Sequence, residues 1–167
     1  MRFDFIEPFV RSTIGVLDKV VRCDVTQGTI SLVNDTAIAG DISIIIHLEN
    51  YPRSGIIVSL DNATALNICR TLNSEPCDTL SPFSRDTLAE LANMIAGNAV
   101  SALNDLGFAF KVSPPLIASA ACIAQKVSGS EIMQVPLYTA CGEITVNAIL
   151  GGNGNEDTHY KACRHCG

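Results

Sequence analysis

The chain has 167 residues, of which 47% are hydrophobic and 17% are charged. This composition is typical of one globular domain with a proper core, and a second domain is not expected. The formal net charge of −6, without any run of lysine or arginine, argues against binding to nucleic acid or to an anionic membrane surface. No apolar run approaches the ~18 residues that span a bilayer. The N-terminus is acidic where a signal peptide would be basic, so a cytoplasmic protein is expected.

Residues 4–20 predict an amphipathic helix, because Ile6, Phe9, Val10 and Leu17 recur at helical spacing. Pro8 is compatible with this helix if it lies in the first turn. The segments that follow are rich in β-branched residues and are broken by Gly, Asn or Asp. They predict three antiparallel strands joined by tight turns, at residues 22–33, 36–48 and 54–60.

Two helices are expected next. Asp61 or Asn62 caps the first, which runs to about Leu72, and the second begins at Ser84 and ends near Leu106-Gly107. Further strands are predicted at residues 108–112, 116–127, 131–139 and 142–150. The order of elements predicts an α+β fold in which an antiparallel sheet is covered on one face by helices. A domain over residues 1–150 and a flexible polar tail over residues 151–167 are therefore expected.

The helix that begins at Ser84 is the most informative segment, because its two faces differ. At about 100° of rotation per residue, one stripe faces a core and contains Leu88, Leu91, Ala92, Ile95, Ala99, Ala102, Leu103 and Leu106. The opposite ridge carries Asp86, Glu90, Asn93, Gly97, Ser101 and Asn104. Glycine inside a helix costs about 1 kcal/mol relative to alanine. Gly97 on the exposed ridge therefore suggests close approach by something from outside.

The chain has seven cysteines, an odd count that argues against a secreted disulfide framework. Buried, reduced thiols are expected at the five that stand mostly among apolar neighbours: Cys23, Cys69, Cys77, Cys122 and Cys141. The other two, Cys163 and Cys166, form a CxxC close to His159 and His165. These four residues could bind zinc. Because a second CxxC is absent, they could instead belong to a flexible reduced tail. His47 lies in an apolar strand and fits a core histidine better than a ligand.

A resemblance to a known family rests on the segment Asp86-xxx-Glu90-xx-Asn93, continued by MIAGNA and followed by Pro114-Pro115. This segment resembles the signature helix of the CheC/CheX/FliY family of chemotaxis phosphatases. The likeness extends to IEPFVRST, GDISIIIHL, SGIIVSL, the next helix and the closing hairpin, in the order of the CheX branch. It spans roughly residues 4–150. An ExxN alone is a weak signal, but with its flanking Asp and Gly and this strand order it is a strong one.

The resemblance implies dephosphorylation of the aspartyl phosphate of a CheY-type response regulator. The acyl phosphate and Mg²⁺ then belong to the regulator, so no cofactor is expected on this chain. Asn93 would hold an attacking water in line with phosphorus, and Glu90 would pair with the regulator's active-site lysine. Gly97 and Ser101 would let the partner's backbone lie close. Asp86 is assigned to the same partner surface, although its first-turn position also suits the helix dipole.

The CheC branch repeats the motif in its first helix, where this chain reads Glu7-Pro8-Phe9-Val10. Valine replaces the asparagine, so one active site per chain is expected. A homodimer formed by pairing of sheet edges is also expected, as in the CheX branch. Two alternatives stay open: a non-catalytic binding module for a phosphorylated regulator or flagellar-switch partner, and a zinc-linked scaffold built on the tail.

Overall fold

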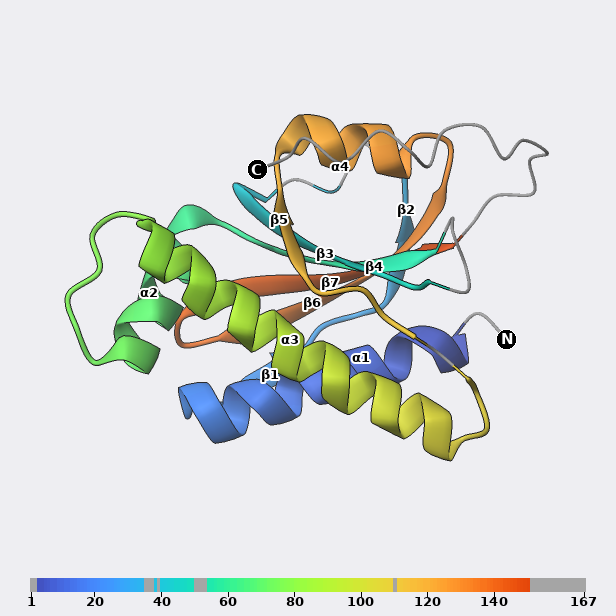
Figure 1. Ribbon diagram of the computed structural model, residues 1–167, viewed down its shortest axis with the longest axis horizontal. Coiled ribbons are helices and arrows are strands. Elements are labelled where there is room, and N and C mark those ends of the chain that lie inside the picture. The colour runs from blue at the N-terminus through green and yellow to red at the C-terminus, as the bar shows by residue number, and fades with distance from the viewer. Residues whose placement is uncertain (1–2, 35–37, 39, 50–53, 110, 151–167) are drawn as a thin grey trace.

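A computed structural model describes residues 3–34, 38, 40–49, 54–109 and 111–150. Its centre is a seven-stranded antiparallel sheet, and Figure 1 shows helices on both sides of it. The α+β class and the antiparallel sheet are therefore confirmed. Within the described residues, no helix is both long enough and apolar enough to cross a membrane. The predicted tail, with Cys163 and Cys166, lies outside the described residues.

The strands follow the order β1-β6-β7-β4-β3-β5, and β2 also pairs with β6. Their bounds are β1 Val25–Gln27, β2 Ser31–Val33, β3 Ile42–His47, β4 Gly55–Leu60, β5 Leu116–Ala118, β6 Glu131–Thr139 and β7 Gly142–Leu150. The predictions for β4, β6 and β7 are confirmed, and β3 lies inside the predicted range. The single strand predicted at 22–33 is wrong, because it divides into β1 and β2, which both pair with the distant β6.

Three helices lie on one face of the sheet, and a π-helical turn extends the first. Helix α1 spans Phe3–Val16, and the π-helical turn continues it over Leu17–Val21. Pro8 lies inside α1 rather than in its first turn, because the helix begins earlier than the apolar pattern indicated. Helix α2 spans Asn62–Asn73, and the carboxylate of its N-cap, Asp61, accepts a hydrogen bond from the Thr64 backbone N–H.

Helix α3 spans Pro82–Asp105 and is followed by Gly107 at a φ of 89°, which agrees with the predicted glycine stop. The strand predicted beyond it, at 108–112, is wrong. Among the described residues of that segment, only Val112 forms a bridge, to Leu48. The two consecutive prolines that follow leave no backbone N–H to extend this pairing.

The strand predicted at 116–127 is also wrong, because it is a short strand followed by a helix. Strand β5 ends at Ala118, and helix α4 spans Ala120–Val127. Ser119 caps α4 by accepting a hydrogen bond from the Cys122 backbone N–H at 3.3 Å. A serine cap followed by alanines favours a helix over a strand. Helix α4 lies on the sheet face opposite α1 and α3, so the expectation of helices on one face alone is incomplete (Figure 1).

The sheet has a hydrophobic core on each face. On β3 and β4, Ile44, Ile46 and Val58 face the larger core with α1, α2 and α3, while Ile45 and Ile57 face the smaller core under α4. Both strands are thus buried on two faces, which explains their nearly continuous apolar runs. The larger core lies directly beneath α3 and fixes which side of that helix remains outside.

The tight β6–β7 hairpin packs against α2 through a glycine. Gly142 has a φ of 134°, and a Cβ added there would collide with the side chain of Thr64, which is buried. Glycine is therefore required at position 142 for two reasons: the unusual backbone conformation and the close approach to a neighbouring helix.

We expect Gly142→Ala to destabilise the fold more than Gly129→Ala. Both glycines have positive φ, but a Cβ at Gly129 would meet nothing within 4 Å. At Gly129, whose φ of 70° is left-handed helical, the backbone conformation costs alanine about 1 kcal/mol. At Gly142 the φ of 134° costs at least as much, and the Thr64 collision adds about 1–3 kcal/mol. Urea unfolding of both variants measures the difference. Equal losses of unfolding free energy would contradict the collision.

Candidate functional site

Helix α3 places its two faces as the sequence pattern predicts, with two exceptions. The side chains of Leu88, Leu91, Ala92, Ile95, Ala99 and Leu103 are buried. Ala102 is exposed, and Leu106 is 66% exposed because it is the C-cap, where the helix and its contact with the core end. Apart from its last turn, the helix is therefore anchored along one stripe and open along the opposite one.

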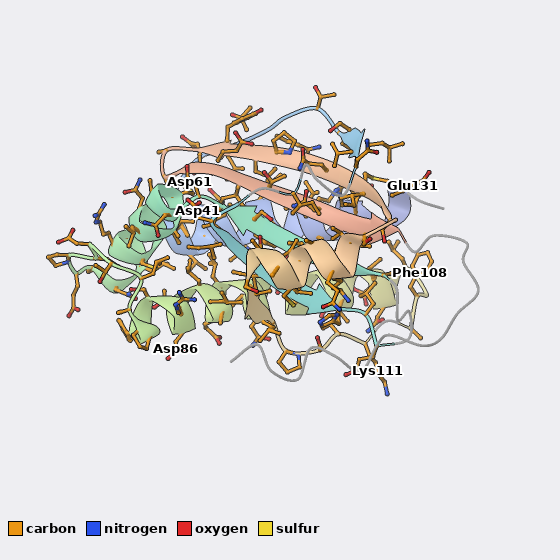
Figure 2. All side chains as sticks on the ribbon, turned by 90° about the horizontal axis from the view of Figure 1, so that it is seen from above. Asp41, Asp61, Asp86, Phe108, Lys111 and Glu131 are labelled. Atoms are coloured by element: carbon orange, nitrogen blue, oxygen red, sulfur yellow. The ribbon has the colours of Figure 1, made fainter. Side chains whose placement is uncertain are left out.

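The polar ridge of α3 faces solvent along its whole length. All six of its members are exposed: Asp86, Glu90, Asn93, Gly97, Ser101 and Asn104. Figure 2 shows Asp86 pointing outward from the helix. Glu90 and Asn93 lie about one helical turn apart. Among the described residues, neither side chain is held by a hydrogen bond or ion pair, so both remain available to a partner.

Gly97 leaves a bare strip of backbone on this ridge. A Cβ built on it would meet nothing within 4 Å, so the packing of this chain does not require glycine there. Ser101, one turn later, turns its hydroxyl back to donate to the Gly97 carbonyl at 2.9 Å. The two residues together give a low stretch of helix surface beside Asn93.

Helix α1 fixes the middle of α3. The two helices lie side by side (Figure 1), and the Ser12 hydroxyl donates a hydrogen bond to the Ile95 carbonyl at 2.7 Å in a buried position. The Ile95 backbone is on the turn that also carries Asn93. This bond therefore ties the ridge to its neighbour at the point where chemistry is expected.

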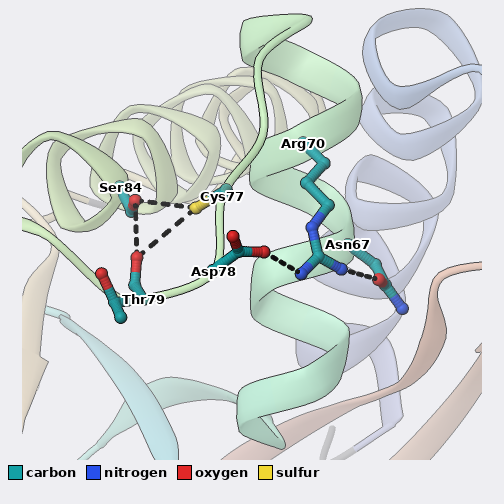
Figure 3. Close-up of polar contacts among 6 residues, drawn as sticks. All are labelled: Asn67, Arg70, Cys77, Asp78, Thr79 and Ser84. Atoms are coloured by element: carbon teal, nitrogen blue, oxygen red, sulfur yellow. Dashed lines mark hydrogen bonds and ion pairs between the residues drawn. The ribbon is translucent and has the colours of Figure 1, made fainter.

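The first turn of α3 is fixed by the loop before it. Ser84 is buried, and its hydroxyl lies 3.1 Å from the Cys77 sulfur and 3.4 Å from the Thr79 carbonyl oxygen (Figure 3). The Cys69 thiol donates to the Ser84 carbonyl at 3.5 Å. These contacts join α2, the loop and α3 in one packed unit.

The cysteines act as small buried side chains. Cys23, Cys69, Cys77 and Cys122 are buried free thiols, as predicted, whereas Cys141 is half-buried. Burial raises the pKa of the Cys69 thiol to about 11, with the neighbouring Cys77 as a second cause. A thiol with such a pKa is protonated near neutral pH and is a poor nucleophile. None of these cysteines belongs to the ridge.

His47 is the last residue of β3, is half-buried and does not belong to the ridge of α3. Burial, followed by the charge of Lys126, lowers its pKa to about 4. The imidazole is therefore neutral at pH 7 and behaves as part of the packing. Within the described residues, no three His, Cys, Asp or Glu side chains come together as metal ligands.

The first helix has no exposed counterpart of Asn93. Val10, which occupies the corresponding position, is 3% exposed and belongs to the larger core. Glu7 is exposed and forms an ion pair with Arg11 at 2.6 Å. The residue at position 10 thus faces inward rather than toward a partner.

A cleft of about 460 Å³ lies near the first turn of α3 but does not include the ridge motif. It is lined by Asp41, Ile42, Asn62, Leu80, Arg85, Ile117, Ala118 and Ser119. Glu90 and Asn93 are not among these residues. The ridge therefore does not form the wall of this cleft.

Comparison with protein families gives one match, to chemotaxis phosphatase CheX, over residues 42–138. This range is more than half of the chain and contains β3, β4, α2 and all of α3. Comparison with curated proteins gives no match.

Comparison with solved structures gives several similar folds. A CheC-like superfamily protein from Shewanella sp. PV-4 has a TM-score of 0.76 at 24% identity, with 91% of this chain and 100% of that chain covered. The CheX–CheY–BeF3–Mg²⁺ complex from Borrelia burgdorferi gives a TM-score of 0.69 at 29% identity, covering 87% and 97%. FliM, in its complex with SpeE from H. pylori, gives 0.66 at 9% identity, covering 90% and 85%, which shows a shared fold alone.

We expect Gly97→Ala to stabilise the isolated protein. A methyl group there meets no neighbour, and alanine favours the helix over glycine by about 0.5–1 kcal/mol. Gly15→Ala in α1 is the matched control, because a Cβ at Gly15 also meets nothing within 4 Å. Chemical denaturation should give a similar gain for both variants. A loss of stability in Gly97→Ala alone would mean that the fold itself needs this glycine.

Proposed function

The chain belongs to the CheX family of chemotaxis phosphatases, which act on the phosphorylated response regulator CheY, and we propose that its Glu90 and Asn93 carry out this activity. One observation supports the assignment most directly. The two side chains lie about one turn apart on an exposed ridge of α3, inside the segment that matches the family. A rigid helix can present both to the phosphorylated aspartate of a docked regulator.

Asn93 suits the task of orienting water. Its amide donates and accepts hydrogen bonds at the same time, and it carries no charge that would repel the phosphoryl oxygens. Holding a water in line with phosphorus lowers the entropic part of the activation barrier, because the water is already in the reactive geometry. The regulator is expected to carry the Mg²⁺ that neutralises phosphoryl charge. Asn93 then completes a site to which the partner contributes most of the electrostatics.

Glu90 suits the task of fixing the complex. A carboxylate at its position can accept a charge-assisted hydrogen bond from a lysine beside the regulator's phosphorylation site. Glu90 and Asn93 are three residues apart on one helix, so a contact made by Glu90 fixes where the Asn93 amide lies. Its proposed role is in positioning, and it transfers no proton.

Gly97, Ser101 and Asp86 are proposed to border the docked regulator. The bare backbone at Gly97 permits approach that any side chain would prevent, and the Ser101 hydroxyl is turned back onto the helix. Asp86 lies one turn before Glu90 on the same exposed side. The helix thus has a low stretch after the reactive pair and an acidic stretch before it.

A non-catalytic binding module on the same helix is the second candidate. The fold is similar to that of FliM, but at 9% identity this similarity concerns the fold alone. Asn93 favours the phosphatase, because a protein that only binds has no need of an amide that orients water.

We also propose a cytoplasmic homodimer paired through sheet edges, with β5 and the β1/β2 pair as the available edges.

We expect Asn93→Ala to lower the acceleration of regulator dephosphorylation by roughly 10²-fold or more, because orientation is the main contribution of the chain. Affinity for the regulator should change much less. The measurement is the lifetime of phosphorylated regulator at saturating protein. Asn98→Ala, an exposed asparagine on the flank of the same helix, is the control and should keep the wild-type rate. Near-normal turnover by Asn93→Ala would contradict the assignment.

Glu90→Ala should weaken complex formation and turnover together. Loss of a charge-assisted contact to a partly desolvated lysine reduces affinity by roughly tenfold or more. The control is Glu143→Ala, which removes an equal exposed charge from β7 rather than from α3. Titration with a regulator held in its BeF3–Mg²⁺ state gives the affinity directly. Wild-type affinity in Glu90→Ala would remove Glu90 from this role.

A further inference from the structure

Three exposed apolar side chains lie on α3 or at its end. In the described part of the chain, six large apolar residues are markedly exposed: Ile30, Leu32, Phe83, Met94, Leu106 and Tyr138. Phe83 and Met94 lie within α3, and Leu106 is its C-cap. Single exposed apolar residues are ordinary on protein surfaces. Their position relative to the ridge therefore decides whether they indicate a binding surface.

Phe83 and Met94 lie on the ridge side of the helix, next to Glu90. Phe83 precedes Glu90 by two turns and Met94 follows it by one, and helical rotation places both within about 40° of Glu90. Asn93 lies on the other flank of Glu90. The two apolar groups are about 16 Å apart along the helix axis, so they mark out a stretch that contains the glutamate.

The packing of the chain does not account for this exposure. Phe83 is 61% exposed and Met94 is 37% exposed, while the core beneath α3 is filled by other side chains of the same helix. Just beyond Met94 the surface is low, because Gly97 has no side chain. An aromatic ring and a methionine beside a low polar stretch resemble the central part of a protein interface, where these residue types are enriched.

We propose that Phe83 and Met94 are apolar anchors that contact the response regulator beside its phosphorylation site and set affinity rather than chemical rate. The proposal rests on the proposed function of Glu90 and Asn93. A stable interface buries about 800 Å² on each partner, which is far more than one glutamate and one asparagine provide. A regulator seated on Glu90 must therefore also cover the helix surface one or two turns away, where Phe83 and Met94 lie.

Affinity and chemical rate would then depend on different residues of the same helix. Apolar contacts made equally before and during the reaction lower KM without changing kcat, whereas Asn93 acts at the reacting atoms. Phe83 and Met94 are positioning and affinity residues, not catalytic ones. Variants at these positions should thus separate the two kinetic constants.

The test compares Phe83→Ala and Met94→Ala with Leu106→Ala. The Leu106→Ala substitution removes a similar exposed apolar group, but Leu106 is the C-cap and projects from the side of the helix opposite Glu90. Binding is measured with a CheY-type regulator of the same cell in its BeF3–Mg²⁺ state, and turnover with the phosphorylated regulator. We expect Kd and KM to rise about tenfold for Phe83→Ala and several-fold for Met94→Ala. Leu106→Ala should leave both constants unchanged.

The maximal rate at saturating regulator should stay within about twofold of wild type in both anchor variants. Unchanged affinity in both, or a maximal rate that falls with unchanged affinity, would overturn the proposal. Failure of the proposed function is a separate result: the wild-type protein would then not shorten the lifetime of the phosphorylated regulator at any concentration. Loss of rate in Asn93→Ala together with unchanged affinity in both anchor variants would reject the anchors alone.

Discussion

The arrangement of this molecule depends on the burial of one stripe of α3. Leu88, Ala92, Ile95 and Ala99 pack into the larger core, and the buried Ser12–Ile95 hydrogen bond holds α1 alongside. Small side chains at two of these four positions let the helices and sheet come close. Once that stripe is fixed, helical geometry determines which residues remain outside. The orientation of Glu90 and Asn93 is thus a by-product of packing by residues that never contact a partner.

The elements that could be predicted from the sequence are those whose signals are local. Helix α3, its glycine stop and its two faces could be predicted, because a long helix has a local period and local end signals. Strands β4, β6 and β7 could be located by their β-branched composition. The resemblance of the ExxN segment pointed to the correct family, and no amount of periodicity would have identified the reaction.

The failures also have physical causes. Residues 22–33 have the composition of one strand, but their partner β6 lies more than a hundred residues away in sequence, and a local pattern does not reveal such a partner. At 116–127 the apolar content suggested a strand, while the Ser119 cap and the alanines after it selected a helix. The exposure of Ala102 and Leu106 followed from where the core ends, which depends on the other elements. The exposure of Phe83 and Met94 could not be predicted from the sequence, because it depends on the tertiary structure around the helix.

The ridge of α3 is convex, and this shape has a consequence for selectivity. The cleft near the first turn of α3 is lined by residues around β5 and by Arg85, and it includes neither Glu90 nor Asn93. If the proposed roles of Glu90 and Asn93 hold, the free protein presents these two groups on an open surface that does not enclose a small molecule. Free acyl phosphates of metabolism gain little from such an open surface. Selectivity for a protein substrate would then follow from shape, because the groups that complete the reaction arrive only with the folded surface of the regulator.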